Sequence, residues 1–502
     1  MTRAQTLRLY LDAARSMRSR QVAARMLRPL RRRWKAAPAR VRELRPLTAP
    51  VKLWRSRAFE GGARVDGGEI DLLGRRLRYP PADWNTPGVE RLRRFHLHYG
   101  EEVLDFARRG DSDGARRALR TWIEGNPPAR GDGWHPYPLS TRTANWIAAA
   151  SLQPAIADTF VADSIWRQLV YLARNVEDEL LGNHVIRNAR ALVLGGVTFG
   201  DERLEQRGLR LLERELPEQV LPDGGHYERS PTYHLIVMRD LLEIRAASGA
   251  AFLDAPVERM RRFAAALARP DGRPALFNDG GFDLAPELEL PPPPPNGLVV
   301  FPDTGYAVLR EGPLWLAFDC GPPAPPFLPP HAHADGLSFQ LWLEGRPIVV
   351  DSGTYTYEAG AERNWFRGTR AHATIAVDGR DQFVSWGSFR AGRFPDVALL
   401  STQPLAAELR MRGLTHRRNI RWTERELFVD DELEGRGRRL VESYLPLAPG
   451  VEPGRFEPVG ELTLSVEHGW VSERFFERTP ARALVARGEL ELPARIGWRI
   501  AL

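Results

Sequence analysis

Two kinds of hydrophobic periodicity divide the chain. Between about residues 90 and 288, apolar residues recur at three- and four-residue spacing in segments such as EEVLDFARRG, STRTANWIAAASL and HVIRNARALVLGGVTFG. This spacing gathers apolar side chains on one face of a helix, and Gly or Pro separates the segments. Several segments occur in pairs, which is typical of helical hairpins arranged in a ring or superhelix.

The periodicity changes from helical to alternating after residue 297. GYAVLREGPLWLAFD and LSFQLWLEGRPIVVD each read as a hairpin, and further short alternating segments follow. Many short strands with Gly turns predict an antiparallel β-sandwich. The run PPPPPNG (291–297) cannot continue a helix and favours an extended linker. We therefore predict a helical domain over 51–290, a Pro-rich linker over 291–297 and a β-sandwich over 298–502, with a small β element near 67–79.

The net charge of +7 is concentrated at the N-terminus. Residues 1–50 contain 14 basic and 2 acidic residues, so the rest of the chain is mildly acidic. A globally basic nucleic-acid-binding protein is therefore not expected. Leu7, Leu11, Ala14 and Met17 recur at helical spacing. This basic helical leader either packs on the body of the protein or binds a membrane surface.

The cysteine content and the absence of recognisable targeting signals exclude further classes of protein. The single cysteine, Cys320, excludes a disulfide framework and any metal site built from several thiolates. No apolar run approaches the roughly 18–20 residues of a membrane span. Arginines interrupt every N-terminal apolar stretch, so no secretory signal is recognisable and a cytoplasmic location is expected, unless the start codon is misassigned.

Histidines and an aspartate cluster in the predicted sandwich. His331 and His333 alternate with Ala in HAHADGLSF, Asp351 ends a following predicted strand, and His372 lies in RAHATIAVDG. In an extended strand, residues i and i+2 point to the same face, so two imidazoles are expected together. Two His with one carboxylate and an open position is a donor set that zinc accepts.

Polar and aromatic residues also cluster in the helical region. Asn183 and His184 begin a predicted helix after Gly182, and residues 223–234 (DGGHYERSPTYH) read as a loop that presents polar side chains before a helix. Aromatic rings stack on sugar faces and arginine binds carboxylates, so the segments 133–146 and 223–234 suit a cleft for sugar acids. Their candidate substrate-binding residues are Trp134, Tyr137, Arg142, Asn145, His226 and Arg229.

Together these motifs resemble the heparinase II/III family of polysaccharide lyases. The matching stretches are GNHVIRNARALVLGGVTF, DGGHYERSPTYHLIVMRDLLE, HAHADGLSFQLWLEGRPIVVDSGTYTY and FRGTRAHATIAVDGRDQ, in the family's order over about residues 90–385. The resemblance implies an incomplete (α/α) toroid followed by an antiparallel β-sandwich, and β-elimination on an anionic, uronate-containing polysaccharide such as a glycosaminoglycan or alginate. It also makes a periplasmic location an alternative.

The resemblance implies roles for individual residues. Asn183 and His184 match the pair that neutralises the uronate carboxylate, Tyr233 matches the general acid that often also serves as base, and His331 matches the catalytic histidine. His333, Asp351 and His372 match the ligands of a structural zinc ion near the cleft, and Asp279 in NDGG matches a loop lining it. Ala373 and Gly336 depart from the family pattern, which leaves subfamily and substrate open.

The chemistry explains these residue types. Hydrogen bonds and positive charge at the uronate carboxylate stabilise the aci-carboxylate that forms when the C5 proton leaves, and Arg229 or Arg142 would add charge. A base must reach C5 and an acid must reach O4. A tyrosine rests protonated near neutral pH, so Tyr233 suits the acid, while either Tyr233 or His331 could be the base.

Two other functional classes remain open at this stage. One is a metal-dependent hydrolase or cupin-like oxygenase that uses the histidines and aspartate of the sandwich at its reaction centre. The other is a non-catalytic glycan-binding or envelope-polysaccharide assembly protein, which the missing signal peptide and basic leader favour. The oligomeric state and endo or exo action are not predicted.

Overall fold

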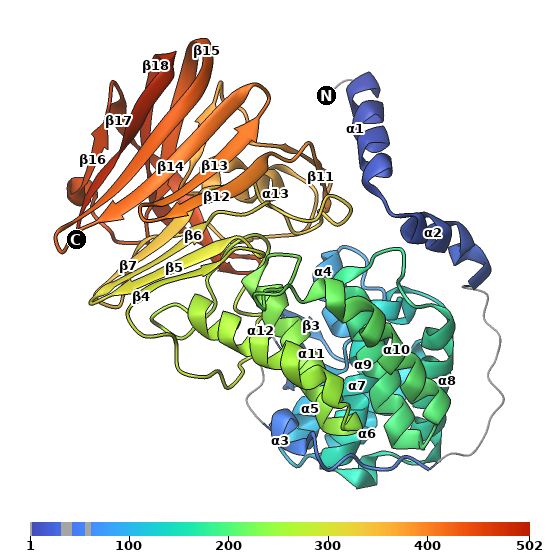
Figure 1. The fold of residues 1–502 in the computed structure, drawn as a ribbon. Helices are drawn as coiled ribbons and strands as arrows, with labels where there is room; N and C mark the ends of the chain where they lie inside the picture. Colours follow the sequence, from blue (N-terminus) through green and yellow to red (C-terminus); the bar gives the residue numbers. More distant parts are fainter. Residues whose placement is uncertain (1–2, 32–42, 56–61) are drawn as a thin grey trace.

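The computed structural model describes residues 3–31, 43–55 and 62–502, and it joins an arc of helical hairpins to a domain of antiparallel sheets (Figure 1). This confirms the predicted toroid followed by a β-sandwich. No helix among the described residues is long and apolar enough to cross a membrane.

Four inner helices and four outer helices form the arc. Each inner helix contacts the next inner helix and also the outer helix that follows it in the chain. The inner helices are α5 (Glu101–Arg108), α7 (Pro136–Leu152), α9 (Gly182–Phe199) and α11 (Pro231–Ser248). The outer helices are α6 (Ser112–Gly125), α8 (Thr159–Arg174), α10 (Glu202–Gln219) and α12 (Asp254–Leu267).

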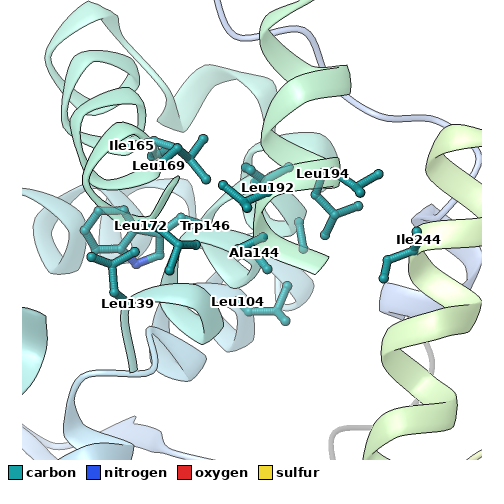
Figure 2. Packing of buried hydrophobic residues seen from close by; sticks show 14 of the residues in the cluster. Leu104, Leu139, Ala144, Trp146, Ile165, Leu169, Leu172, Leu192, Leu194 and Ile244 are labelled. Atoms are coloured by element: carbon teal, nitrogen blue, oxygen red, sulfur yellow. The ribbon is translucent and has the colours of Figure 1, made fainter. Parts of the chain in front are cut away.

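Capping and core packing explain why these segments are helices. Asp111, Asp158 and Asp201 each accept a hydrogen bond from a backbone N–H in the first turn of an outer helix. Leucine, isoleucine and tryptophan side chains from several helices interdigitate between the layers (Figure 2). Apolar burial is the main favourable term in such a core.

Short elements complete the toroid side. They are α3 (Val51–Arg55), α4 (Arg91–Leu97) and an antiparallel three-stranded sheet of β1 (Arg64–Asp66), β2 (Glu69–Leu72) and β3 (Arg75–Arg78). The sheet corresponds to the predicted β element near 67–79.

Two sheets pack face to face in the second domain. Leu316, Phe318 and Leu341 of the first sheet share one buried cluster with Leu409, Ile420 and Trp498 of the other. The first sheet has the order β4 (Gly297–Phe301), β5 (Tyr306–Glu311), β6 (Leu314–Asp319), β7 (Phe339–Leu343), β8 (Arg346–Val349).

The second sheet is built around two long strands, β15 (Glu426–Pro446) and β18 (Glu477–Ala501), which pair antiparallel. Its other strands are β9 (Ile375–Val377), β12 (Asp396–Thr402), β13 (Leu405–Met411), β14 (Leu414–Trp422), β16 (Phe456–Val459) and β17 (Thr463–Arg474). A separate hairpin consists of β10 (Val384–Trp386) and β11 (Arg390–Gly392), and helix α13 (Ala361–Phe366) lies nearby in the chain.

The segment between the last toroid helix and the first strand connects the domains. The Pro-rich stretch 291–297 leads into β4, as predicted. Before it, the Asp279 N–H donates to the His331 carbonyl (3.0 Å) and the Phe282 N–H donates to the Glu473 carbonyl (2.8 Å). Backbone hydrogen bonds therefore fix this part of the toroid against a loop and a strand of the sheet domain.

The basic leader contains α1 (Arg3–Ser16) and α2 (Ser19–Arg31), which lie beside the body of the protein (Figure 1). In α1, Asp12 pairs with Arg393 of the sheet domain (3.1 Å). Between α1 and α2, Arg18 forms a two-pronged ion pair with Glu218 at the end of α10. The described part of the leader therefore packs on the body and contacts both domains, while residues 1–2 and 32–42 of the predicted leader lie outside the described residues.

Candidate active site

Tyr233 stands in the first turn of α11, where the toroid faces the sheet domain. Pro231 is the first residue of the helix, and the Ser230 hydroxyl accepts a hydrogen bond from the Tyr233 N–H (3.2 Å). The same hydroxyl donates to the carbonyl of Asp279 (2.5 Å). One serine thus caps the helix and fixes it to the loop between the domains.

The Tyr233 ring stacks on His331, with centroids 3.8 Å apart. Its hydroxyl lies 2.9 Å from the hydroxyl of Tyr357, which comes from the loop after β8. Burial raises the pKa of Tyr233 well above the usual value of a tyrosine. Tyr233 therefore rests protonated and is suited to donate a proton.

Two carboxylates hold His331. Its Nδ1 lies 3.1 Å from Asp279 Oδ2, and its Nε2 lies 3.2 Å from Glu228 Oε2. The other Glu228 oxygen accepts a hydrogen bond from the Asn183 backbone N–H (2.7 Å). Glu228 therefore ties the first turn of α9 to the histidine of the sheet domain.

A left-handed turn brings Asn183 and His184 to the start of α9. Leu181 and Gly182 have φ values of 63° and 57°. A Cβ on Gly182 would lie 2.2 Å from Glu228 Oε1, so only glycine allows this approach. The Asn183 side chain is buried, whereas 31% of the His184 side chain is exposed. The His184 ring lies 4.6 Å from the ring of Tyr137, which is consistent with the predicted position of Tyr137 at the cleft.

Asp279 is an anchor for the site. Arg363 of α13 binds both of its carboxylate oxygens, and both His331 and His333 approach it. Burial alone would raise the pKa of Asp279, but Arg363 and the imidazoles outweigh burial and hold it well below its usual range. Because its oxygens are already occupied, Asp279 orients the histidines and is not free to bind a sugar directly.

His333, Asp351 and His372 meet in one buried cluster. One potential ligand atom from each lies within 4.8 Å of the others. His372 Nδ1 lies 2.8 Å from Asp351 Oδ2, while His333 Nδ1 and His372 Nε2 are buried without hydrogen-bond partners. Burial lowers the pKa of His333 to about 4, so it is neutral, the form that binds metals. These observations fit a divalent metal such as zinc.

The local structure around His331 and His333 differs from the expected strand. Both residues lie in a loop, and β7 begins only at Phe339. Their imidazoles still converge, because each approaches one oxygen of Asp279. The prediction of a shared strand face was wrong, and an aspartate from the other domain brings the two side chains together.

Arg142 and Trp134 are structural residues and not part of the cleft. The fully buried Arg142 guanidinium donates to Gln168 (2.7 and 2.9 Å) and to the carbonyl of His98 (3.0 Å). The indole N–H of buried Trp134 donates to the carbonyl of Asn126 (3.3 Å). Their predicted substrate-binding roles were therefore wrong, because both side chains are buried and bonded to other parts of the toroid.

The segment 223–234 is a loop followed by a helix, as predicted, but most of its polar side chains are buried. His226 contacts Gln219 (3.2 Å), and Asn145 of α7 donates to the carbonyl of Tyr99 (3.0 Å). Arg229 donates to the carbonyls of Thr304 (3.0 Å) and other loop residues. These contacts engage His226, Asn145 and Arg229 within the protein, so the structure does not support them as substrate ligands.

Several site residues escaped the sequence analysis: Glu177, Glu228, Tyr357 and Arg363. Glu177 lies 3.2 Å from His184 Nδ1, and the others contact Asn183, His331, Tyr233 or Asp279. Glu228 lies in DGGHYERSPTYH and Tyr357 lies in DSGTYTY, two stretches that already belonged to the motifs. Their position in these motifs was the signal that could have identified them. Glu177 and Arg363 carried no recognisable spacing.

Family comparisons agree with this architecture. Residues 115–283 match the heparinase II/III N-terminal model, and residues 293–477 match the heparinase II/III-like C-terminal model. The chain belongs to the heparinase II/III family. The first model ends at residue 283 and the second begins at residue 293.

Relatives within and around this family carry different names. FtsZ-localized protein C of Caulobacter vibrioides is 28% identical over 484 residues, covering 88% of this chain and 78% of that protein. The heparin-sulfate lyase of Pedobacter heparinus is 24% identical over 351 residues, covering 59% of this chain and 51% of that enzyme. The matched region thus spans about half the length of that lyase.

Solved structures confirm the fold. A crystal structure of heparinase III aligns with a TM-score of 0.71 at 17% identity, covering 96% of this chain and 90% of that one. The chondroitin AC lyase of Streptomyces coelicolor A3, in complex with chondroitin sulphate, aligns with a TM-score of 0.52 at 12% identity, covering 90% and 78%. The toroid and sandwich are therefore shared with heparinase III.

Proposed function

We propose that this protein is a polysaccharide lyase that cleaves a uronate-containing glycan by β-elimination. The observation that carries the proposal is the convergence of Asn183 and His184 from α9, Tyr233 from α11 and His331 from the sheet domain. Relatives named heparin-sulfate lyase support the same carbon–oxygen lyase class and favour a glycosaminoglycan-like substrate.

The residues divide the reaction between them. Asn183 and His184 face the uronate carboxylate and stabilise the aci-carboxylate. A base takes the C5 proton, the C–H electron pair forms the C4–C5 double bond, and the C4–O4 bond breaks. Protonated Tyr233 gives its proton to O4. His331 stacks on Tyr233 and is the second candidate for the base, although both of its ring nitrogens face carboxylates, Asp279 at Nδ1 and Glu228 at Nε2.

A structural zinc ion is part of the proposal. His333, Asp351 and His372 would hold it, and it would supply cross-links between the loops after β8 and before β7 and β9. The cluster is sealed from solvent, which favours a structural ion over a reaction centre of a hydrolase. Activity that is lost on chelation but survives in Asn183→Ala and Tyr233→Phe would instead support the hydrolase.

A substrate panel tests the lyase. Heparan sulfate, chondroitin, hyaluronan and alginate should be incubated with the protein, and the unsaturated uronate product detected by near-ultraviolet absorbance. We expect at least one substrate to give product and Tyr233→Phe to abolish it. Tyr171→Phe, a buried tyrosine of α8 outside the site, is the matched control. Absence of product from all four glycans, or an active Tyr233→Phe, would contradict the proposal.

A second candidate function is binding to an anionic membrane surface through the leader. Gln21 and Ala24 are buried against the body, while Val22 and Met26 of α2 remain 41% and 75% exposed beside Arg25. Exposed apolar residues among arginines on one helix suit the interface of anionic lipids. One relative, FtsZ-localized protein C, is named for its place in the cell and not for a glycan that it cleaves. A role in localisation is therefore a second candidate for this chain.

Vesicle sedimentation tests this second candidate. Wild-type protein should sediment with vesicles that contain anionic lipid and not with neutral ones, and a Val22→Ser, Met26→Ser double variant should lose binding. Phe252→Ser, an exposed apolar residue on the toroid, is the matched control. Equal sedimentation of all variants would refute a leader-specific contact. The cytoplasmic location stays a prediction, which cell fractionation tests.

A further inference from the structure

Glu177 lies in the loop between α8 and α9, behind the exposed histidine of the site. Its Oε1 is 3.2 Å from His184 Nδ1 and 3.4 Å from His135 Nδ1. Its Oε2 accepts from the Asn188 side chain (3.1 Å), and its backbone N–H donates to the same side chain (2.9 Å). Asn188 also donates to the Ser140 hydroxyl (3.0 Å). The carboxylate is therefore fixed by α7 and α9 before any substrate arrives.

The orientation of His184 follows from its burial. Nδ1 is buried 3.2 Å from Glu177 Oε1, an ion-pair contact without the geometry of a hydrogen bond, yet 31% of the side chain is exposed. The exposed surface must therefore belong to other atoms of the side chain. Nε2 sits across the ring from Cγ and next to Cε1, so it is the ring nitrogen available to the opening.

We propose that Glu177 is a positioning residue that holds His184 as an imidazolium, with Nδ1 toward the protein and Nε2 toward the substrate carboxylate. This inference rests on the proposed lyase function and assigns a residue that the motifs do not. A charged donor forms a hydrogen bond to a carboxylate that is about twice as strong as a neutral one. Glu177 would thus strengthen the binding of the developing aci-carboxylate without touching the sugar.

The charges around His184 support this assignment. Burial lowers the pKa of His184, but Glu177 outweighs burial and, with smaller contributions from Glu228 and Glu179, raises it above the usual value. Arg28 of α2 pairs with Glu179 (3.4 Å). By element, the groups facing or surrounding His184 are Glu177 and Glu179 from the α8–α9 loop, His135 and Tyr137 from the start of α7, Glu228 from the loop before α11, and Arg28 from α2.

Glu177→Gln tests the role in the full-length protein. It keeps the size of the side chain and its contacts with Asn188, but removes the charge. We expect kcat/KM to fall about 10-fold, less than the roughly 10²-fold cost of losing a whole donor. The alkaline limb of the pH profile should move to lower pH, because His184 loses its proton earlier. Glu102→Gln, a buried carboxyl of the same domain whose pKa burial raises to about 7, is the matched control and should leave both unchanged.

A titration separates this inference from the lyase itself. NMR of ¹³C-labelled histidine, with the His184 signal assigned from His184→Gln, should show a lower pKa in Glu177→Gln than in wild type. This holds whether or not any glycan is cleaved. Glu177→Asp keeps the charge and should retain most of the wild-type titration, which also covers the case in which Glu177→Gln does not fold. An unchanged His184 titration in Glu177→Gln, or equal loss in both variants, would overturn the proposal.

Discussion

Two histidine clusters lie on opposite sides of the domain junction, and they differ in solvent exposure. In the toroid, Glu177 pairs with His184, which keeps part of its ring exposed. In the sheet domain, Asp351 pairs with His372, and neither is accessible to any substrate. The same pair of a carboxylate and an imidazole can therefore have two roles. An exposed pair can exchange its contacts for contacts with a ligand, whereas a buried pair can only stabilise the fold or hold a metal.

The largest difference between the two histidine clusters should appear in the free energy of unfolding. Removing one partner of a buried ion pair leaves a buried charge, so His372→Ala should lower the free energy of unfolding by about 3–5 kcal/mol. His184→Ala should cost less, because part of the His184 side chain is already exposed and the Asn188 side chain still donates to the Glu177 carboxylate that is left behind. Urea unfolding followed by fluorescence measures both. Similar losses for the two variants would mean that the clusters do not differ as their exposure indicates.

The second-largest difference between the two histidine clusters should appear in metal binding. A ligand that binds only the folded state at about 100 times its Kd stabilises it by about 2.7 kcal/mol. Zinc added to metal-free protein should therefore raise the unfolding midpoint of wild type and of His184→Ala, but not of His333→Ala. A zinc-dependent shift that survives in His333→Ala would place the metal elsewhere.

The smallest effect is a pH dependence of the open cluster. The pKa of His184 is raised in the folded state, so its charge contributes stability fully below the unfolded value of about 6.5. This contribution is lost as the pH rises through the folded pKa. The stability difference between wild type and His184→Gln should therefore shrink with rising pH, as measured by urea unfolding at several pH values. A difference that grows with pH would show that His184 is not charged in the folded protein.

The sequence predicted the two-domain architecture well because both periodicities are strong and local. Helical spacing was read to about residue 288, whereas the last toroid helix ends at Leu267; the first strand begins at Gly297, where alternation was expected, and each signal comes from burial of one face. The convergence of His333, Asp351 and His372 was also predicted, although His331 and His333 lie in a loop. The alternation of residues gave the right pair for the wrong geometric reason, since Asp279 and not a strand aligns them.

The predicted substrate-binding roles were wrong for polar residues that lie in the interior of the protein. An arginine beside aromatic residues looks the same on a cleft wall as in a core, and only the positions of Gln168 and the His98 carbonyl show that Arg142 is buried. The pairing of Tyr233 with Tyr357 joins residues 124 positions apart, on different domains. Such contacts depend on how the domains meet, which no local pattern encodes.

The position of the leader has a consequence for the order of assembly during synthesis. Tyr10 and Asp12 leave the ribosome about 380 residues before their partners Arg390 and Arg393. Since domains fold as units from the N-terminus onward, α1 must wait until both the toroid and the sheet domain exist. Its docking is therefore a late event, and protection of the leader from a protease would report that a newly made chain has completed both domains.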